Sequence, residues 1–373
     1  MNPSRPGSRL AAASSRTSYQ VWFPIAVYAI TRLIDLVFIL IAARHQVALP
    51  REPTGLAGFY LWEPSPASPG YGAVASNWDG QWYFSIATHG YPATLPRDAA
   101  GHVVPNQWAF YPAFPLLVGA IMRLSGLGFT VVAPILNVLL GGAAVTVMFR
   151  LINQRSGRFA ASATVLLTCT YMAAPVLQIA YTESLALLLV CTALLLLRNR
   201  RYGWLIPVLV MLALTRGVAL AFMPVVVVHG ICRYRRRFVE PFAVLDRWRV
   251  LGLACLTVAL LGLWPAIAGI TTRDPQAYIK TLSSYDTQGR LHVLIAYPAF
   301  VWARGGAVGL AILLGTIALI AVIVLRSGAT AWGPEVRAWA GFYPLYLLLA
   351  TSPLSDAVRH LLLAFPLLLP FPD

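Results

Sequence analysis

The sequence is poor in charge, and lysine and acidic residues are its scarcest components. Only 11% of the 373 residues are charged, whereas 58% are hydrophobic. Lys280 is the only lysine among the 28 basic residues, and there are 13 acidic ones. A soluble domain needs more charge than this to cover its surface. The composition therefore excludes an ordinary soluble domain.

The net charge of +15 could indicate binding to nucleic acid, but its distribution argues against that class. The basic residues cluster in short stretches beside apolar runs. Such clusters are typical of the loops that fix the orientation of a membrane protein. We therefore expect contact with membrane lipids and no nucleic-acid partner.

Cysteine is also scarce, and its placement excludes a disulfide framework in the polar part of the chain. All four cysteines lie within or at the edge of apolar segments: Cys169, Cys191, Cys232 and Cys255. We interpret them as small core residues. The sequence has no D-x-D motif, no histidine-rich ligand spacing and no glycine-rich nucleotide loop. No metal or other cofactor is therefore predicted, although a divalent ion would be compatible with the sequence.

Long hydrophobic runs make up most of the chain, and several reach the roughly 20 residues needed to cross a bilayer. Membrane-barrel strands would be shorter and would alternate in polarity. We predict an all-α polytopic membrane protein with about ten spans. After a first span over 20–43, the expected crossings are 130–149, 159–178, 184–198, 203–232 (out and back, turning near Arg216), 250–270, 304–325, 338–350 and 358–371.

Residues 1–19 are polar and basic, which predicts a cytoplasmic N-terminus. The first apolar run is long enough to remain as a span instead of being cleaved as a signal peptide. Residues 20–373 then form a single transmembrane domain, into which the large outer loop 44–129 is inserted. The last apolar run stops at Asp373, as an unfinished helix would.

An apolar run inside the outer loop, residues 108–124, resembles a further span. The later arginine clusters fall on the cytoplasmic side only if this run does not cross. Pro112 and Pro115 also make it a poor continuous helix. We expect a re-entrant or surface-lying helix that presents Tyr111 near Asp79.

Arg32 and Asp35 lie three residues apart within the first span, on one face of the helix. Charges at membrane depth are unfavourable unless they are paired. A structural ion pair is the preferred interpretation, and a functional role is the alternative.

Residues 77–91 are the most informative stretch, because Asp79 lies there among aromatic residues. Aromatic faces stack on sugar rings, and a carboxylate can take the proton from an attacking hydroxyl. The alternative is an interfacial amphipathic helix, since Trp78, Trp82 and Ile86 recur at roughly helical spacing.

Four motifs occur in the order typical of PIG-V-like mannosyltransferases, which add mannose during GPI-anchor synthesis and have many bacterial relatives. Residues 78–91 resemble the family signature W-D-x-x-[HW]-[FY]-x-x-I-A-x-x-G-Y, residues 109–116 resemble A-F-[FY]-P-x-[FY]-P-L, residues 181–184 resemble Y-T-E-S and residues 214–216 resemble L-T-R. A looser match at Arg359 and His360 extends the resemblance. Trp82 stands where eukaryotic members have histidine.

The resemblance implies a GT-C-like helical bundle with juxtamembrane helices in the first outer loop. It implies a glycosyltransferase that moves mannose from polyprenyl-phosphate-mannose to a lipid or glycan acceptor outside the cytoplasm. Direct displacement inverts the sugar and needs one base, for which we assign Asp79. The remaining candidates that could bind or orient a substrate are Trp78, Trp82, Tyr83, Tyr111, Tyr181 and Glu183.

Arginine suits a donor phosphate because its planar fork binds two oxygens and stays charged. Arg216 and Arg359 are the candidates, with His360 third. The alternative for Arg216 is an interfacial anchor or a partner for Glu183. On the predicted topology these candidates share the outer face. Asp79 and Tyr111 lie in the first outer loop, and the outer ends or turns of later spans carry the others: Tyr181, Glu183, Arg216, Asp356, Arg359 and His360.

A transporter or flippase of lipid-linked intermediates is the alternative function, because it would also have many helices, buried charges and outer arginines. Transporters more often place polar sites at the membrane midplane, where this chain has only Arg32 and Asp35. An inactive relative acting as an assembly subunit is a third interpretation. The high arginine content favours a bacterial plasma membrane.

Overall fold

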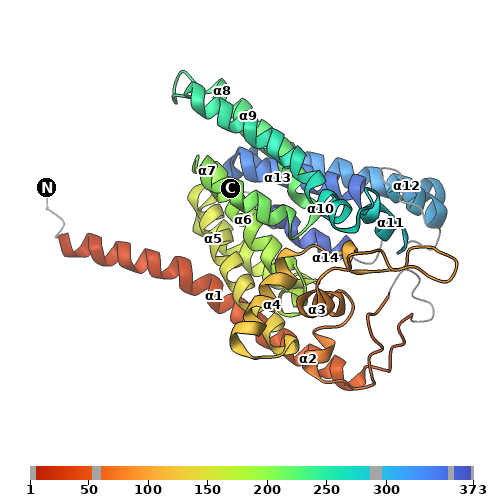
Figure 1. The fold of residues 1–373 in the computed structure, drawn as a ribbon. Coiled ribbons are helices and arrows are strands. Elements are labelled where there is room, and N and C mark those ends of the chain that lie inside the picture. The colour runs from red at the N-terminus through yellow and green to blue at the C-terminus, as the bar shows by residue number, and fades with distance from the viewer. Residues whose placement is uncertain (1–5, 53–59, 286–295, 352–356, 371–373) are drawn as a thin grey trace, which may run out of the picture.

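The computed structural model describes residues 6–52, 60–285, 296–351 and 357–370 (Figure 1). In these residues the chain is helical, with isolated bridges but no named strand. Five helical segments are long and apolar enough to cross a membrane: Ser18–His45, Phe129–Cys169, Gly217–Arg235, Val244–Thr272 and Ala296–Leu325. The predicted all-α polytopic membrane fold is therefore confirmed.

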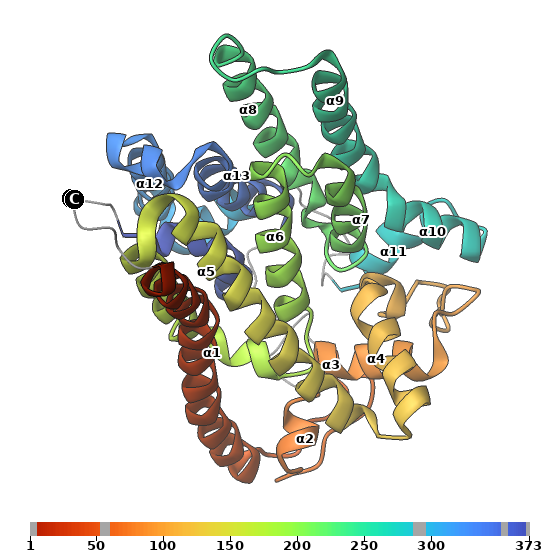
Figure 2. The ribbon, with the colours of Figure 1, turned by 90° about the vertical axis from the view of Figure 1, so that its left-hand side faces the viewer.

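The first helix, α1 (Pro6–His45), is continuous through the first predicted span and extends toward the N-terminus beyond it. Trp22, Leu33 and Phe38 on this helix are more than 60% exposed, as suits a surface in contact with lipid. The opposite side of α1 packs against α5 (Figure 2).

The helix α5 (Phe129–Cys169) is a hairpin of two antiparallel arms. The sulfur of Met148 and the hydroxyl of Thr168 lie 3.7 Å apart although 20 residues separate them. One straight helix would separate them by about 30 Å. The chain reverses at Gly157, whose φ of 81° and ψ of 174° are accessible to glycine without steric penalty. The first arm contains the helix predicted at 130–149, whereas the helix predicted at 159–178 ends early, at Cys169, and continues as a turn and a 3₁₀ segment.

The ion pair predicted inside the first span is present, with 2.7 Å between Arg32 and Asp35. Arg32 also donates hydrogen bonds to the carbonyl oxygens of Cys169 and Ala174. These carbonyls lie where α5 ends and a 3₁₀ turn, Ala174–Gln178, begins. A helix that breaks at membrane depth needs donors for its freed carbonyls. Arg32 supplies them, which supports its structural interpretation.

The next helices are α6 (Glu183–Arg198), α7 (Tyr202–Ala213) and α8 (Phe222–Arg235). The turn between α7 and α8 contains Arg216, as predicted. The helix α6 carries Glu183 at one end and Arg198 at the other, about 22 Å apart along its axis. Charged residues from several helices gather at both of these ends.

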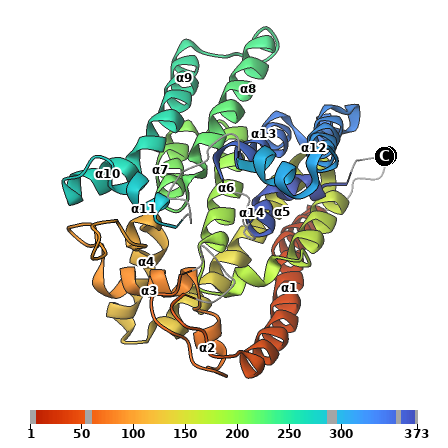
Figure 3. The same cartoon turned by 90° about the vertical axis from the view of Figure 1, so that its right-hand side faces the viewer.

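The second half of the chain folds back over the outer loop. Its helices are α9 (Val244–Ala259), α10 (Leu263–Thr272), α11 (Ala277–Ser283), α12 (Ala296–Leu325), α13 (Pro334–Ala350) and α14 (Ala357–His360). Figures 2 and 3 show α8 and α9 side by side, with α10 and α11 turned toward α4. Trp264 of α10 packs on Trp108 of the outer loop, with 5.2 Å between ring centroids.

The outer loop contains α2 (Tyr71–Val74), α3 (Asp79–His89) and α4 (Ala113–Ser125). With 13 residues, α4 is shorter than the roughly 20 that a crossing requires. It packs against α3 through Phe114 and Tyr83, whose ring centroids are 5.6 Å apart. The apolar run at 108–124 is therefore a short helix that holds α3 in place.

Candidate active site

Asp79 is the first residue of α3, and the residue before it has an unusual backbone. Trp78 has a φ of 56° and a ψ of −116°, a region that bulky side chains rarely occupy. Strained residues of this kind cluster at functional sites. The strain at Trp78 therefore makes the start of α3 a candidate functional position.

Four charged residues from distant parts of the sequence form one connected cluster. Arg359 Nη1 lies 2.6 Å from Asp79 Oδ2, and Arg359 Nε lies 3.1 Å from Glu183 Oε1. Arg216 Nη1 lies 2.6 Å from the same oxygen of Glu183. The structure thus joins the start of α3, the start of α6, the turn before α8 and the short helix α14.

The two carboxylates of this cluster differ in their exposure to solvent. The side chain of Glu183 is 1% exposed, whereas that of Asp79 is 28% exposed. Glu183 is buried against two guanidinium groups, so it holds Arg216 and Arg359 in place. Asp79 is the carboxylate that a substrate could reach.

Two tyrosines line the buried side of the cluster. The guanidinium of Arg359 lies over the ring of Tyr181, 4.8 Å from its centroid. Tyr83 is buried within electrostatic reach of all four charged residues. Burial raises the pKa of Tyr83, so its phenol stays neutral and can act as a hydrogen-bond donor.

An aromatic hollow lies about one helical turn beyond Asp79. It has a volume of about 480 Å³ and is lined by Tyr60, Trp62 and Trp82 among others. Trp82 is 4% exposed and donates from Nε1 to the carbonyl of Tyr60 at 3.0 Å. Tyr285 packs edge-on against Trp82 and lies within electrostatic reach of Asp79. Trp82 therefore connects the hollow to the helix that begins at Asp79.

Tyr111 and His360 lie at the edge of the cluster. The hydroxyl of Tyr111, which we expected near Asp79, lies 3.0 Å from that of Tyr278, beside Gly217 and within electrostatic reach of Arg216. His360 lies within electrostatic reach of Arg216 and Arg359, and its carbonyl accepts a hydrogen bond from Tyr343. Asp356 lies outside the described residues.

Sequence reasoning missed the aromatic residues that the second half of the chain brings to the site. Tyr278 and Tyr285 reach Tyr111 and Trp82 from the segment around α11, and the Tyr346 hydroxyl donates to the carbonyl of Gly217 at 2.6 Å. The one signal for them was the tyrosine content of an otherwise polar segment after α10.

The described residues contain no group of three or more His, Cys, Asp or Glu side chains placed to hold a metal ion. Asp79 and Glu183 are the two carboxylates of the cluster, and each is bound to an arginine. In this arrangement the oxygen atoms of both carboxylates face arginine side chains.

Comparison of the sequence with family models and with curated proteins gave no match. Among solved structures, the chain is similar to an oligosaccharyltransferase of Archaeoglobus fulgidus, crystallised with zinc and sulfate, at 13% identity and a TM-score of 0.38. The match covers 92% of this chain and 48% of the archaeal one, so it spans about half of that protein's length.

Proposed function

We propose that this protein is an integral-membrane glycosyltransferase of the GT-C type, similar to PIG-V-like mannosyltransferases. The donor is polyprenyl-phosphate-mannose, and the acceptor is a hydroxyl of a lipid or glycan on the outer face of a bacterial plasma membrane. The cluster of Asp79, Glu183, Arg216 and Arg359 carries this proposal, because all four positions come from the matched motifs and meet in space.

The cluster contains the groups that one displacement step requires. Asp79 accepts the proton of the acceptor hydroxyl while that oxygen bonds to the anomeric carbon. The bond from this carbon to the donor phosphate breaks, and the electron pair leaves on the phosphate. Arg216 and Arg359 stabilise the phosphate charge. The products are an inverted glycoside and a polyprenyl phosphate.

The ion pairs of the cluster also explain how Asp79 is held before reaction. Two carboxylates and two guanidinium groups balance one another, and Arg359 bridges Asp79 and Glu183. A donor phosphate is an anion that competes with Asp79 for Arg359. When Arg359 turns to the phosphate, Asp79 loses its partner and is free to accept a proton.

The aromatic hollow is where we place the acceptor. Trp62 and Trp82 offer ring faces and edges to a sugar, and Asp79 lies about one turn away along α3. A hollow of about 480 Å³ suits one or two sugar rings. This arrangement brings an acceptor hydroxyl to the most exposed carboxylate of the cluster.

The alternative of a transporter rested on charges inside the membrane. Arg32 is 4% exposed, bonds two backbone carbonyls and pairs with Asp35. These groups stabilise the chain where α5 ends, and Arg32 also lines a cavity of about 780 Å³ between α1 and α5. Their bonding to the backbone favours a structural role for the pair over a transport site.

The experiment that tests the proposal measures sugar transfer from radiolabelled polyprenyl-phosphate-mannose in membranes that contain wild type or Asp79→Asn. Wild type is expected to label a lipid or glycan, and Asp79→Asn to lose about 10²-fold or more of that rate. Asp98→Asn, which changes an exposed acid of the same outer loop, is the matched control and keeps full activity. Equal transfer by wild type and Asp79→Asn would exclude Asp79 as the base. No transfer by wild type would exclude polyprenyl-phosphate-mannose as the donor.

A further inference from the structure

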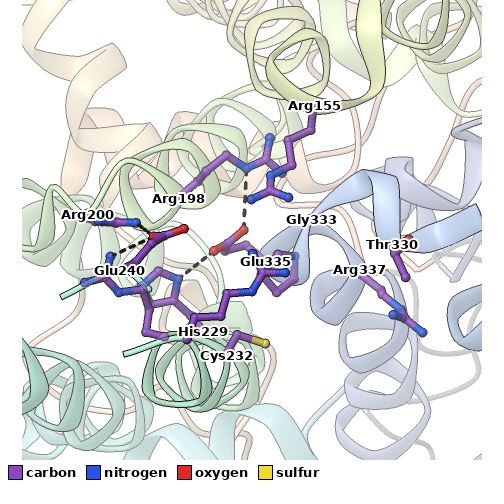
Figure 4. A pocket seen from close by; sticks show the side chains of 13 residues that line it. Arg155, Arg198, Arg200, His229, Cys232, Glu240, Thr330, Gly333, Glu335 and Arg337 are labelled. Carbon is purple, nitrogen blue, oxygen red and sulfur yellow. Dashed lines mark hydrogen bonds and ion pairs between the residues drawn. The ribbon is translucent and has the colours of Figure 1, made fainter. Parts of the chain in front are cut away.

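A second polar cavity lies at the Arg198 end of α6, opposite the end that carries Glu183. Figure 4 shows the side chains that line it. The cavity has a volume of about 240 Å³ and is lined by residues at the bend of α5, at the ends of α6 and α8 and at the start of α13. The sequence places this end on the cytoplasmic side. None of the residues assigned to sugar transfer lines it.

The cavity carries an excess of positive charge. Two glutamates, Glu240 and Glu335, and six arginines line it: Arg155, Arg198, Arg200, Arg233, Arg236 and Arg337. Glu335 is held by His229 at 2.7 Å and approaches Arg198 at 3.7 Å, and Glu240 pairs with Arg200. The acids therefore leave most of the guanidinium charge uncompensated.

Three of these arginines have N–H groups that no hydrogen bond between described residues satisfies. Arg233 is 7% exposed; its Nη2 donates to the carbonyl of Pro241 and its Nη1 lies 3.9 Å from Glu240, but its Nε and Nη1 are buried without a hydrogen-bond partner. Arg155 and Arg236 are exposed, and among the described residues their side chains make no ion pair or hydrogen bond. Buried donors without acceptors, such as those of Arg233, are unfavourable. An anion in the cavity would satisfy them.

The start of α13 adds to the attraction for an anion. Gly333, Pro334 and Glu335 line the cavity at the N-terminus of this 17-residue helix. Helix N-termini carry a partial positive charge and favour phosphate.

An apolar groove continues directly from this cavity. It has a volume of about 450 Å³ and runs between α8, α12 and α13 along Val228, Ile320, Gly341 and Leu345. Cys232, Pro334 and Arg337 line both hollows. A charged cavity joined to an apolar groove fits a phospholipid, which has a charged headgroup and apolar acyl chains.

We propose that this compound site binds an anionic phospholipid, with its phosphate among the arginines and one acyl chain in the groove. A soluble phosphate would explain the arginines but would leave the groove empty. Basic pockets between membrane helices are known to select lipid headgroups in this way. The site is independent of the proposed sugar transfer, since it shares no residue with the Asp79 cluster.

The test measures binding of phosphatidylglycerol to the purified full-length protein in detergent by native mass spectrometry. Phosphatidylcholine with the same chains and glycerol 3-phosphate are the comparison probes. Arg155→Gln with Arg236→Gln removes charge from the cavity without removing a side-chain bond between described residues. Arg201→Gln with Arg235→Gln is the matched control, because these two exposed arginines lie near the same end but outside the cavity.

Phosphatidylglycerol is expected to bind more tightly than either comparison probe. The cavity pair should weaken it about 25-fold, at about fivefold for each guanidinium removed, and the control pair should change it less than threefold. Gly341→Leu, which fills the groove and favours helix, should weaken lipid binding and leave glycerol 3-phosphate unaffected.

Equal losses in the cavity and control pairs would overturn the proposal in favour of general surface attraction. Binding of glycerol 3-phosphate as tight as that of the lipid, or normal lipid binding by Gly341→Leu, would overturn the role of the groove. Should the arginine pair fail to fold, the Gly341→Leu result decides on its own.

Discussion

The two ends of α6 show two ways in which a membrane protein uses arginine. At the Glu183 end, two arginines meet two carboxylates and every charge of the cluster has a partner. At the Arg198 end, six arginines line a cavity with two glutamates. We propose that the first arrangement holds Asp79 until a substrate phosphate displaces it from Arg359, and that the second leaves charge available for an anion.

The balance at the Glu183 end predicts the largest effect on stability. Glu183→Gln leaves Arg216 and Arg359 close together without their shared buried partner. Breaking a buried pair in this way reduces the free energy of unfolding by about 3–5 kcal/mol. Thermal unfolding of the detergent-solubilised protein measures it.

The matched control for Glu183 is Glu240 at the Arg198 end, whose side chain is 42% exposed. Glu240→Gln is expected to change the unfolding free energy by less than about 1 kcal/mol, as for an exposed pair. A smaller effect at Glu183 than at Glu240 would contradict the distinction between the two ends.

Replacing Arg359 sharpens the comparison through function. Arg359→Lys keeps the charge but loses the fork that contacts Asp79 and Glu183. We expect kcat/KM for the donor to fall about 10- to 100-fold, since a charged hydrogen bond is lost in the transition state. Steady-state transfer rates measure it.

The control for Arg359→Lys is Arg200→Lys, which alters an exposed ion pair at the far end of α6. That variant should transfer sugar at the wild-type rate. If Arg359→Lys also kept the wild-type kcat/KM, the guanidinium fork would have no part in holding the phosphate.

The smallest predicted effect concerns the aromatic hollow. Trp82→Phe keeps the aromatic packing but removes the hydrogen bond to the Tyr60 carbonyl. It should raise KM for the acceptor about threefold to tenfold and leave KM for the donor unchanged, because one hydrogen bond is worth about 1 kcal/mol. Separate titrations of the two substrates measure it, and an equal rise in both would remove the hollow from the acceptor site.

Much of the helical arrangement was predictable from the sequence. Long apolar runs, arginine clusters and the prolines of 108–124 predicted the two arms of α5, the turn at Arg216 and a run too irregular to cross. The Arg32 to Asp35 pair followed from their spacing within one helix. These features are local, or depend on which side of a membrane a helix ends.

The pairing of side chains was not predictable, because it depends on how distant helix ends meet. The sequence predicted that Asp79, Glu183, Arg216 and Arg359 lie on the same side of the membrane. Nothing in it indicated that Arg359 would contact both acids. Tyr111 faces Tyr278 because α10 and α11 fold back over the outer loop. The arginine-lined cavity was not predictable for a related reason. Arginine clusters predict the orientation of single helices, but not that their side chains meet around one cavity.

The most direct test of the central claim is donor affinity in the Asp79→Asn protein. If a phosphate must take Arg359 from Asp79, removing the carboxylate charge leaves Arg359 more available. We predict that Asp79→Asn binds a non-transferable polyprenyl-phosphate sugar about tenfold more tightly than wild type but no longer transfers sugar. Weaker donor binding, in step with lost transfer, would contradict it and make Asp79 part of the donor site itself.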